Sequence, residues 1–334
     1  MPHAPTLPHR TAARSRDPPA RGSGQAVSAH DDLVTSHRPS GGDRDKVREE
    51  MRRPARGGGT MSAVPHDGAT RGRPLVIAHR GSSSAEPEHT LSAYLRAIEE
   101  GADALECDVR LTADSHLVCV HDRRVNRTSN GRGIVSTLEL AELEGLDWGS
   151  WKAQHAGDSE MPDHHRNRLL TLRRLLSAVT ASERPLGLTI ETKHPTRYAG
   201  LVERQLARML AEFGLDTPRQ PGDHWVRMMS FSQLAVQRMR QLCPHVPTVY
   251  LMHEVVPLRF RDGSLPRGIH TAGLDIKIVR RWPQTVERQH ARGHEVYVWT
   301  VDEPEDVRLC LELGVDAIIS NRPNLVVDAL QTTR

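Results

Sequence analysis

The chain has 334 residues, of which 37% are hydrophobic and 4% aromatic, and its formal net charge is +3. This length can hold one large core or two small ones, because domains cluster at roughly 100–200 residues and α/β barrels run to about 250. No segment approaches the ~18 apolar residues of a spanning helix, and no charged leader precedes an apolar run of about 7–15 residues. We therefore expect no stable membrane insertion and no secretory signal, and the predicted location is the cytoplasm.

The first 72 residues differ in composition from the rest of the chain. They are rich in Pro, Gly, Ser, His and Arg, with almost no apolar run, so they cannot bury enough surface to offset the entropy of ordering. They hold 12 basic and 8 acidic residues, whereas the remainder holds 33 and 34. We predict a disordered tail over residues 1–72, with Met51 and Met61 as alternative starts, and a folded domain over 73–334. Because the tail intersperses acids and lacks aromatic residues, nucleic acid is not an expected partner.

From Pro74 onward, strand and helix patterns alternate. Apolar, β-branched runs predict nine strands, at Leu75–Ala78, Ala104–Val109, Leu117–Val120, Leu186–Ile190, Val226–Ser230, Thr248–Met252, Ala272–Ile276, Glu295–Trp299 and Ala317–Ser320. Stretches of helical period lie between most of them, among them Leu91 to Gly101, Arg197 to Gly214, Phe231 to Cys243 and Glu305 to Gly314. Alternation of this kind predicts parallel strands that are joined by crossover helices.

One connection is too short for a parallel crossover. Only seven residues separate Val109 from Leu117, whereas a crossover needs about a dozen or more, so these two strands should form a hairpin. With the turn centred on Asp114–Ser115, Asp108 lies opposite His121 within one residue of register. Eight strands remain, which predicts an α/β fold of the TIM (β/α)8 barrel type.

Titratable side chains gather at the ends of the predicted barrel strands, which is where TIM barrels place their active sites. His79 and Arg80 end the first strand. Glu106 and Asp108 stand two residues apart, so the period of a strand points both side chains the same way. The hairpin should bring His121 back beside these carboxylates. We therefore predict that the five side chains form one site.

The next barrel strand repeats this spacing with Glu191 and Lys193. Two acids on one strand and one on its neighbour form an oxygen-rich cup that suits a hard divalent cation, Mg²⁺ or Ca²⁺. The plainer alternatives are a solvated rim for Glu106 and Asp108 and a simple ion pair between Glu191 and Lys193. Acids that point toward a barrel axis are costly unless they are paired or coordinated, which favours the metal site.

Eight segments carry a resemblance to a known enzyme family. They are HRG (His79 to Gly81), PEHT (Pro87 to Thr90), LECDVRLTADSHLVCVHD (Leu105 to Asp122), TLRRLL (Thr171 to Leu176), IETK (Ile190 to Lys193), SF (Ser230 and Phe231), VWTVDE (Val298 to Glu303) and ISNRP (Ile319 to Pro323). In order and spacing they resemble the glycerophosphodiester phosphodiesterase family, a TIM barrel like that of phosphatidylinositol phospholipase C. The resemblance covers residues 74–331.

The resemblance implies an enzyme that hydrolyses glycerophosphodiesters, which are small molecules, to sn-glycerol 3-phosphate and an alcohol. It also implies that His79 and His121 form the acid/base pair and that Glu106, Asp108 and Glu191 hold the metal. Residues 123–168 resemble the inserted region of the family, which caps the site and helps to choose the alcohol.

The chain departs from the family pattern in PEHT, where the family usually has Asn at the position of His89. Imidazole can still donate a hydrogen bond, so we expect activity to be retained, with the geometry of the substrate loop in question. Glu88 and Trp299 are predicted to line the glycerol pocket, although structural packing is an equal alternative for each. Asn321, at the end of the last predicted strand, is expected to form hydrogen bonds, either in the substrate pocket or within the protein structure.

The mechanism follows from the chemistry of the bond. A divalent ion in the carboxylate cup, helped by Arg80 and Lys193, would neutralise charge that gathers on the phosphate in the transition state. One histidine removes a proton from the attacking oxygen and the other protonates the leaving alkoxide, each transfer typically contributing about 10²–10⁴-fold. We assign His79 as the base and His121 as the acid, and the reverse stays open. The nucleophile, water or the glycerol 2-hydroxyl, also stays open.

Two other functions are kept as alternatives. A lysophospholipase D on a related barrel would need an apolar groove or membrane-facing loops. The inserted region offers six apolar side chains, which we expect to pack a short helix instead: Leu138, Leu140, Leu143, Leu146, Trp148 and Trp151. A non-catalytic binding barrel is disfavoured because no catalytic position is missing.

Overall fold

A computed structural model of the chain describes residues 72–152 and 167–332, apart from 198, 219 and 221. The predicted disordered tail falls on residues 1–72 and so lies, except for its last residue, outside the described part of the chain. The predicted inserted region, residues 123–168, is described except for 153–166. Within the described residues no helix has the length and apolar character needed to cross a membrane.

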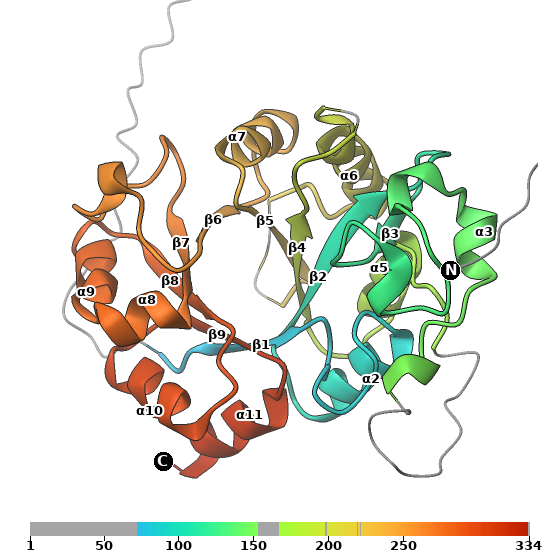
Figure 1. Cartoon of the computed structure of the whole chain (residues 1–334). Helices are drawn as coiled ribbons and strands as arrows, with labels where there is room; N and C mark the ends of the chain where they lie inside the picture. The colour runs from blue at the N-terminus through green and yellow to red at the C-terminus, as the bar shows by residue number, and fades with distance from the viewer. Residues whose placement is uncertain (1–71, 153–166, 198, 219, 221, 333–334) are drawn as a thin grey trace, which may run out of the picture. The chain divides into compact units, whose positions relative to one another are not determined.

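Eight parallel strands close into a barrel, as the sequence predicts, in the order β1, β2, β4, β5, β6, β7, β8, β9 and back to β1 (Figure 1). The strands of the described residues, including β3 outside the barrel, are β1 (Leu75–His79), β2 (Ala104–Leu111), β3 (Leu117–Cys119), β4 (Gly187–Thr192), β5 (Trp225–Ser230), β6 (Thr248–Met252), β7 (Thr271–Asp275), β8 (Glu295–Trp299) and β9 (Ala317–Ser320). Each differs from its predicted range by only a few residues. The TIM-barrel prediction is confirmed.

The extra strand β3 pairs antiparallel with β2, so the predicted hairpin is confirmed. Its register places Val109 opposite Cys119, and the amide of Val120 donates to the carbonyl oxygen of Asp108. Asp108 therefore lies opposite Val120 and not His121, a shift of one residue that falls within the predicted margin. A three-residue strand is enough because it only has to return the chain to the mouth of the barrel.

Helices surround the strands on the outside of the barrel (Figure 1). The α-helices of the described residues are α2 (Leu91–Glu99), α3 (Leu140–Glu144), α5 (Leu172–Thr180), α6 (Leu201–Glu212), α7 (Gln233–Leu242), α8 (Ile276–Arg281), α9 (Gln284–Ala291), α10 (Pro304–Glu312) and α11 (Pro323–Thr332). Three short 3₁₀ turns complete them, η1 (Val125–Arg127), η2 (Val135–Thr137) and η3 (Leu258–Phe260). Hydroxyl side chains begin several helices: Thr90, Thr171 and Ser232 accept the amides at the starts of α2, α5 and α7, which satisfies donors that a helix leaves unpaired.

The hydrophobic core has two layers that follow from strand alternation. Residues such as Leu105 and Cys107 point outward and pack under the helices. Residues of opposite parity point inward and fill the barrel lumen: Ile77, Ala104, Met229, Val249, Leu251, Tyr297, Ala317 and Ile319. Because side chains of a strand alternate between its two faces, any residue two positions beyond an inward one also faces the lumen, nearer its mouth.

The segment after β3 forms a small core of its own. Val125, Val135, Leu143 and Trp148 are buried together, and the Trp148 indole donates to the carbonyl oxygen of Leu143 at 2.9 Å. Leu138, Leu140 and Leu146 pack against this cluster. Five of the six predicted apolar side chains therefore pack around the short helix α3 and do not form an exposed apolar groove. The sixth, Trp151, donates its indole N–H to the carbonyl oxygen of Trp148 at 3.1 Å.

Candidate active site

The site side chains continue the inward rows of the barrel. His79 follows Ile77 on β1, and Trp299 follows Tyr297 on β8, each two residues nearer the carboxyl end. Glu106 follows Ala104 on β2 in the same way. The alternation of side chains along each strand therefore places these site residues at the mouth of the barrel, directly above the apolar lumen.

A cavity of about 330 Å³ opens at this mouth. The described residues that line it are His79, Arg80, Glu106, His121, Glu191, Lys193, Met229, Phe231, Leu251, His253, Trp299, Thr300 and Ile319. The structure therefore brings together seven of the nine predicted site residues around one space. The other two are Asp108, which lies in the carboxylate cluster beside it, and Glu88.

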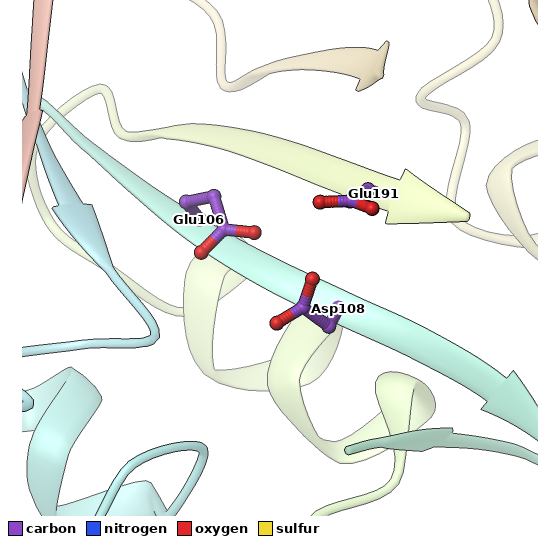
Figure 2. A group of neighbouring side chains, drawn as sticks. All are labelled: Glu106, Asp108 and Glu191. Carbon is purple, nitrogen blue, oxygen red and sulfur yellow. The ribbon is translucent and has the colours of Figure 1, made fainter. Parts of the chain in front are cut away.

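Three carboxylates converge from neighbouring strands. Figure 2 shows Glu106 and Asp108 on β2 beside Glu191 on β4, with one oxygen of each within 4.8 Å of the others. The register sets this geometry, since Asp108 pairs directly with Glu191 across the two strands. All three side chains are buried. An all-oxygen donor set of this kind suits a hard divalent cation.

Asp108 is the ionised centre of the cluster. Burial would raise its pKa, but Lys193 and Arg80 outweigh burial and hold the pKa well below its usual value. Lys193 Nζ lies 3.1 Å from Asp108 Oδ1, and Arg80 Nε lies 3.0 Å from Oδ2. Lys193 Nζ also reaches Glu191 Oε1 at 2.8 Å. The two predicted phosphate-binding cations therefore contact the carboxylates directly.

The other two carboxylates are destabilised as anions. Burial, and then the charge of Asp108, raises the pKa of Glu191 to about 8 and raises that of Glu106 well above its usual value. Two cations, Arg80 and Lys193, are too few for three buried carboxylates at this spacing. A divalent cation would relieve this repulsion, so the residues present fit the predicted metal.

His79 is held in a defined tautomer. The amide nitrogen of Asn321 donates to Asp302 Oδ2 at 2.6 Å, which turns the amide oxygen toward His79 Nδ1 at 2.7 Å. Nδ1 therefore carries the proton and donates to that oxygen, and Nε2 keeps its lone pair. Burial, and then the charge of Arg80, lowers the pKa of His79 to about 3. The ring is neutral, with Nε2 at 4.0 Å from Glu106 Oε2.

His121 has the opposite kind of partner. Its Nδ1 lies 2.7 Å from Asp122 Oδ1. Burial would raise the pKa of Asp122, but hydrogen bonds, first that from Arg127, lower it to about 2. Burial is also the largest influence on His121 and lowers its pKa. The hydrogen bond to Asp122 raises the pKa of His121 and the one to Asn321 raises the pKa of His79, but only the partner of His121 carries a negative charge.

Glu88 does not line the cavity but contacts Arg127, the same arginine that binds Asp122. Arg127 donates to both of its carboxylate oxygens at 2.7 Å, and Arg80 Nη1 approaches at 3.2 Å. Burial would raise the pKa of Glu88, but Arg127 and Arg80 lower it to about 2. The predicted contact of Glu88 with glycerol stays a prediction, since the structure places Glu88 against two arginines.

His89 is buried beneath the carboxylates. Its Nε2 lies 2.9 Å from Asp108 Oδ2, and its Nδ1 lies 2.8 Å from the Tyr94 hydroxyl. Burial is the largest influence and lowers the pKa of His89. Nε2 donates to Asp108, and the Tyr94 hydroxyl beside Nδ1 also donates to the carbonyl oxygen of Glu106 at 3.1 Å. Its φ of 61° is left-handed, a conformation in which Asn, Asp and His are enriched. His89 thus orients a carboxylate and does not line the cavity.

The HRG turn is shaped by backbone constraints. Arg80 has a φ of 58°, and its amide donates to Glu106 Oε2 at 3.0 Å. A Cβ on Gly81 would lie 2.6 Å from the backbone carbon of Ala93 in α2, so only glycine fits there. The turn therefore fixes Glu106 from the backbone side.

Sequence reasoning named Trp299 for the wall of the cavity but missed the two rings beside it, Phe231 and His253. Phe231 meets Trp299 edge-on with ring centroids 5.4 Å apart, and His253 stacks on Trp299 at 5.7 Å. His253 had a usable signal, because it follows the inward Leu251 by two residues. Asp302 lies in the VWTVDE segment of the resemblance, but its role could not be predicted there because it depends on the contact with Asn321.

The comparisons with known proteins agree with this geometry. A sequence model described as "Glycerophosphoryl diester phosphodiesterase family" matches residues 79–325. A Mycobacterium tuberculosis protein named probable glycerophosphodiester phosphodiesterase 1 is 45% identical over 259 residues, which cover 77% of this chain and 92% of that protein. The chain belongs to the glycerophosphodiester phosphodiesterase family. A Bacillus subtilis glycerophosphodiester phosphodiesterase is 32% identical over 257 residues, 76% of this chain and 85% of that protein.

Solved structures of this family share the barrel. An Oleispira antarctica phosphodiesterase in complex with the product sn-glycerol-3-phosphate has a TM-score of 0.63 at 25% identity, covering 77% of this chain and 97% of that one. A glycerophosphodiester phosphodiesterase described as putative, from Galdieria sulphuraria, has a TM-score of 0.64 at 23% identity over 78% of this chain and 98% of its own, which supports the fold alone.

Proposed function

We propose that this phosphodiesterase hydrolyses glycerophosphodiesters to sn-glycerol 3-phosphate and an alcohol, with His79 and His121 as its acid/base pair. The observation that carries the proposal is one cavity that holds both histidines beside the carboxylate cluster. Glu106, Asp108 and Glu191 would hold one divalent ion, Mg²⁺ or Ca²⁺. When bound, the ion supplies positive charge for the non-bridging phosphate oxygens and for the attacking oxygen.

His79 is suited to the base and His121 to the acid. The lone pair on His79 Nε2 is unprotonated at neutral pH, because the pKa of the ring is lowered to about 3, so it is available for the proton of the attacking oxygen. The same low pKa makes the ring a weak base, and its basicity has to rise as negative charge gathers on the substrate beside it. A proton on His121 is stabilised by the ionised Asp122. Because the two histidines have different hydrogen-bond partners, one is suited to accept a proton and the other to donate one.

Trp299 is suited to the glycerol moiety. Its indole nitrogen is buried and has no hydrogen-bond partner among the described residues, and the ring lines the cavity. A buried donor without an acceptor is costly, so a substrate hydroxyl would be stabilised there. Phe231 and His253 fix the ring from two sides.

The test is product release from glycerophosphocholine by wild type, His79→Ala and His121→Ala. Each variant should lose about 10²–10⁴-fold in kcat while its melting temperature stays near that of wild type. Asn130→Ala, in the segment after β3 and away from the cavity, is the matched control and should turn over like wild type. A mild loss in both histidine variants would overturn the acid/base assignment.

A second candidate, hydrolysis of lysophospholipids by the same cavity, is favoured by exposed apolar side chains beside it. Phe231 lines the cavity, and Leu234 and Leu258 are 63% and 78% exposed. Arg259 donates to Gln233 at 2.9 Å, which joins the loop of Leu258 to the start of α7. Activity on long-chain lysolipids, without activity on glycerophosphocholine, would favour this candidate. The cytoplasmic location of the reaction stays a prediction.

A further inference from the structure

A second cavity lies beside the catalytic one at the same end of the barrel. Its volume is about 320 Å³, close to that of the catalytic cavity, and Lys193 lines both. Its walls come from the end of β2, the segment after β3 that includes η2, and the loop after β4. One water takes about 30 Å³ in the liquid, so the space is large enough for a phosphate group and its linker.

The walls of this second cavity carry positive charge. Arg110, Arg123 and Arg197 line it together with Lys193, and none of the described lining residues is a carboxylate. The charge of Lys193 is shared with the carboxylate cluster, as described above. Arg197 donates to the carbonyl oxygen of Ser136 at 3.3 Å, which joins the loop after β4 to η2. We call this space the arginine cavity.

Arg110 links the arginine cavity to the acid/base pair. Its Nε and Nη2 donate to the carbonyl oxygen of His121 at 3.0 and 2.7 Å, which leaves Nη1 for another acceptor. Arg110 is partly buried, and Arg123 and Arg197 are exposed. Guanidinium groups bind phosphate and carboxylate through paired hydrogen bonds.

We propose that the arginine cavity binds a phosphate or carboxylate group carried by the leaving alcohol, an inference that rests on the proposed function. The glycerol half of the substrate has no charge apart from the phosphodiester, which the catalytic cavity binds. A second anionic group on the same substrate therefore belongs to the alcohol. Lys193, which borders both cavities, lies where such a substrate would pass from one to the other.

The test compares two glycerophosphodiesters whose alcohols, propanediol and hydroxypropyl phosphate, differ by one terminal phosphate group. Wild type should prefer the anionic substrate by about tenfold or more in kcat/KM, the size expected for one or two charge-assisted hydrogen bonds. Arg123→Gln should remove this preference and leave the propanediol substrate unchanged. Arg124→Gln is the matched control, since this exposed neighbour does not line the cavity, and it should keep the preference.

A second arm separates a substrate group from a free anion, by calorimetric titration of inorganic phosphate into the same three proteins. Phosphate binding that Arg123→Gln weakens, with no substrate preference, would assign the cavity to a free anion and overturn the assignment to the alcohol. Equal kcat/KM for both substrates and equal phosphate binding in all three proteins would overturn the site altogether. If neither substrate is hydrolysed, the proposed function fails, and the phosphate titration alone decides whether the arginines bind an anion.

Discussion

The two ends of the barrel lumen differ in how their charged groups are balanced. At the amino end, Arg227 donates to both oxygens of Glu295, with Nη1 at 2.6 Å, and the Thr271 hydroxyl donates to the same carboxylate at 3.1 Å. One cation meets one anion there, and the Arg227 guanidinium also lies over the Tyr297 ring at 5.3 Å. At the carboxyl end, three carboxylates face two cations.

The difference separates a structural ion pair from a site that is prepared for a ligand. A balanced, hydrogen-bonded pair contributes to packing and needs nothing further. The carboxyl end holds an excess of carboxyl groups, three against two cations. The cost of ionising all three appears in Glu191, whose pKa is raised to about 8 by burial and then by the charge of Asp108. Such a cost persists where function needs it. The excess is therefore the structural sign of a cation site.

The largest difference in activity is expected when one glutamate at each end of the barrel is neutralised. Glu191→Gln should lower kcat/KM by about a thousandfold or more, because several kcal/mol of charge stabilisation depend on the bound ion, and should leave the stability of the metal-free chain unchanged or higher. Glu295→Gln should keep turnover and lower stability by roughly 1 kcal/mol. Steady-state kinetics and denaturant unfolding measure both effects. A loss of activity in Glu295→Gln, with Glu191→Gln active, would reverse the assignment of the two ends.

The next effect concerns the tautomer of His79. Asn321→Ala removes the oxygen that holds the Nδ1 proton, so kcat should fall by about 10–100-fold, as for other outer partners of a site, with little change in KM. Asp302→Asn should show a smaller loss in the same direction, because the amide of Asn321 is then less firmly oriented. The pH profile of kcat distinguishes a positioning role from a packing role, since only the former should move its acid limb. Unchanged kcat in both variants would contradict the role.

His89 offers a smaller and more specific test. His89→Leu removes the donor to Asp108 and should lower activity and metal affinity by about tenfold or more. His89→Asn should retain most activity, because Asn suits the φ of 61° and can donate a hydrogen bond. Tyr94→Phe, which removes only the hydroxyl that meets Nδ1, should cost less than His89→Leu. Equal activity of His89→Leu and wild type would show that Asp108 needs no such donor.

The Arg127 network predicts how stability depends on pH. Glu88 and Asp122 have pKa values of about 2 in the folded chain, below their usual values of 4.5 and 3.8, so their contribution is complete above about pH 4.5 and is lost as the pH falls toward 2. For Glu88, which is largely buried, the loss is on the order of 3 kcal/mol. Unfolding by denaturant across this range should show the decline, and Arg127→Gln should flatten it. If Arg127→Gln leaves the pH dependence of the unfolding free energy unchanged, groups other than Glu88 and Asp122 cause it.

Much of the fold could be predicted from the sequence because strand period is local. The spacing of Glu106 and Asp108 fixes their common direction, and a seven-residue link forces the hairpin that returns His121. The exact register could not be predicted, because Asp114 and Ser115 allow turns that differ by one residue.

Contacts between distant segments could not be predicted in this way. Asn321 and His79 are 242 residues apart, and only barrel closure brings them together. Glu88 was expected at the glycerol pocket from its place in the loop after HRG, but its direction depends on Arg127 from another segment. The roles of the site residues stay predictions, because geometry shows where side chains lie and not what they catalyse.

The most direct test of the central claim is a calorimetric titration of Mg²⁺ or Ca²⁺ into the metal-free protein near neutral pH, in two buffers that differ in ionisation enthalpy. We expect one ion to bind with release of protons, because the pKa values of Glu191 and Glu106 lie above their usual range and a cation displaces their protons. Glu191→Gln should weaken binding and reduce the proton release. Absence of binding, or binding that Glu191→Gln leaves unchanged, would contradict the claim that the excess carboxylates form a metal site.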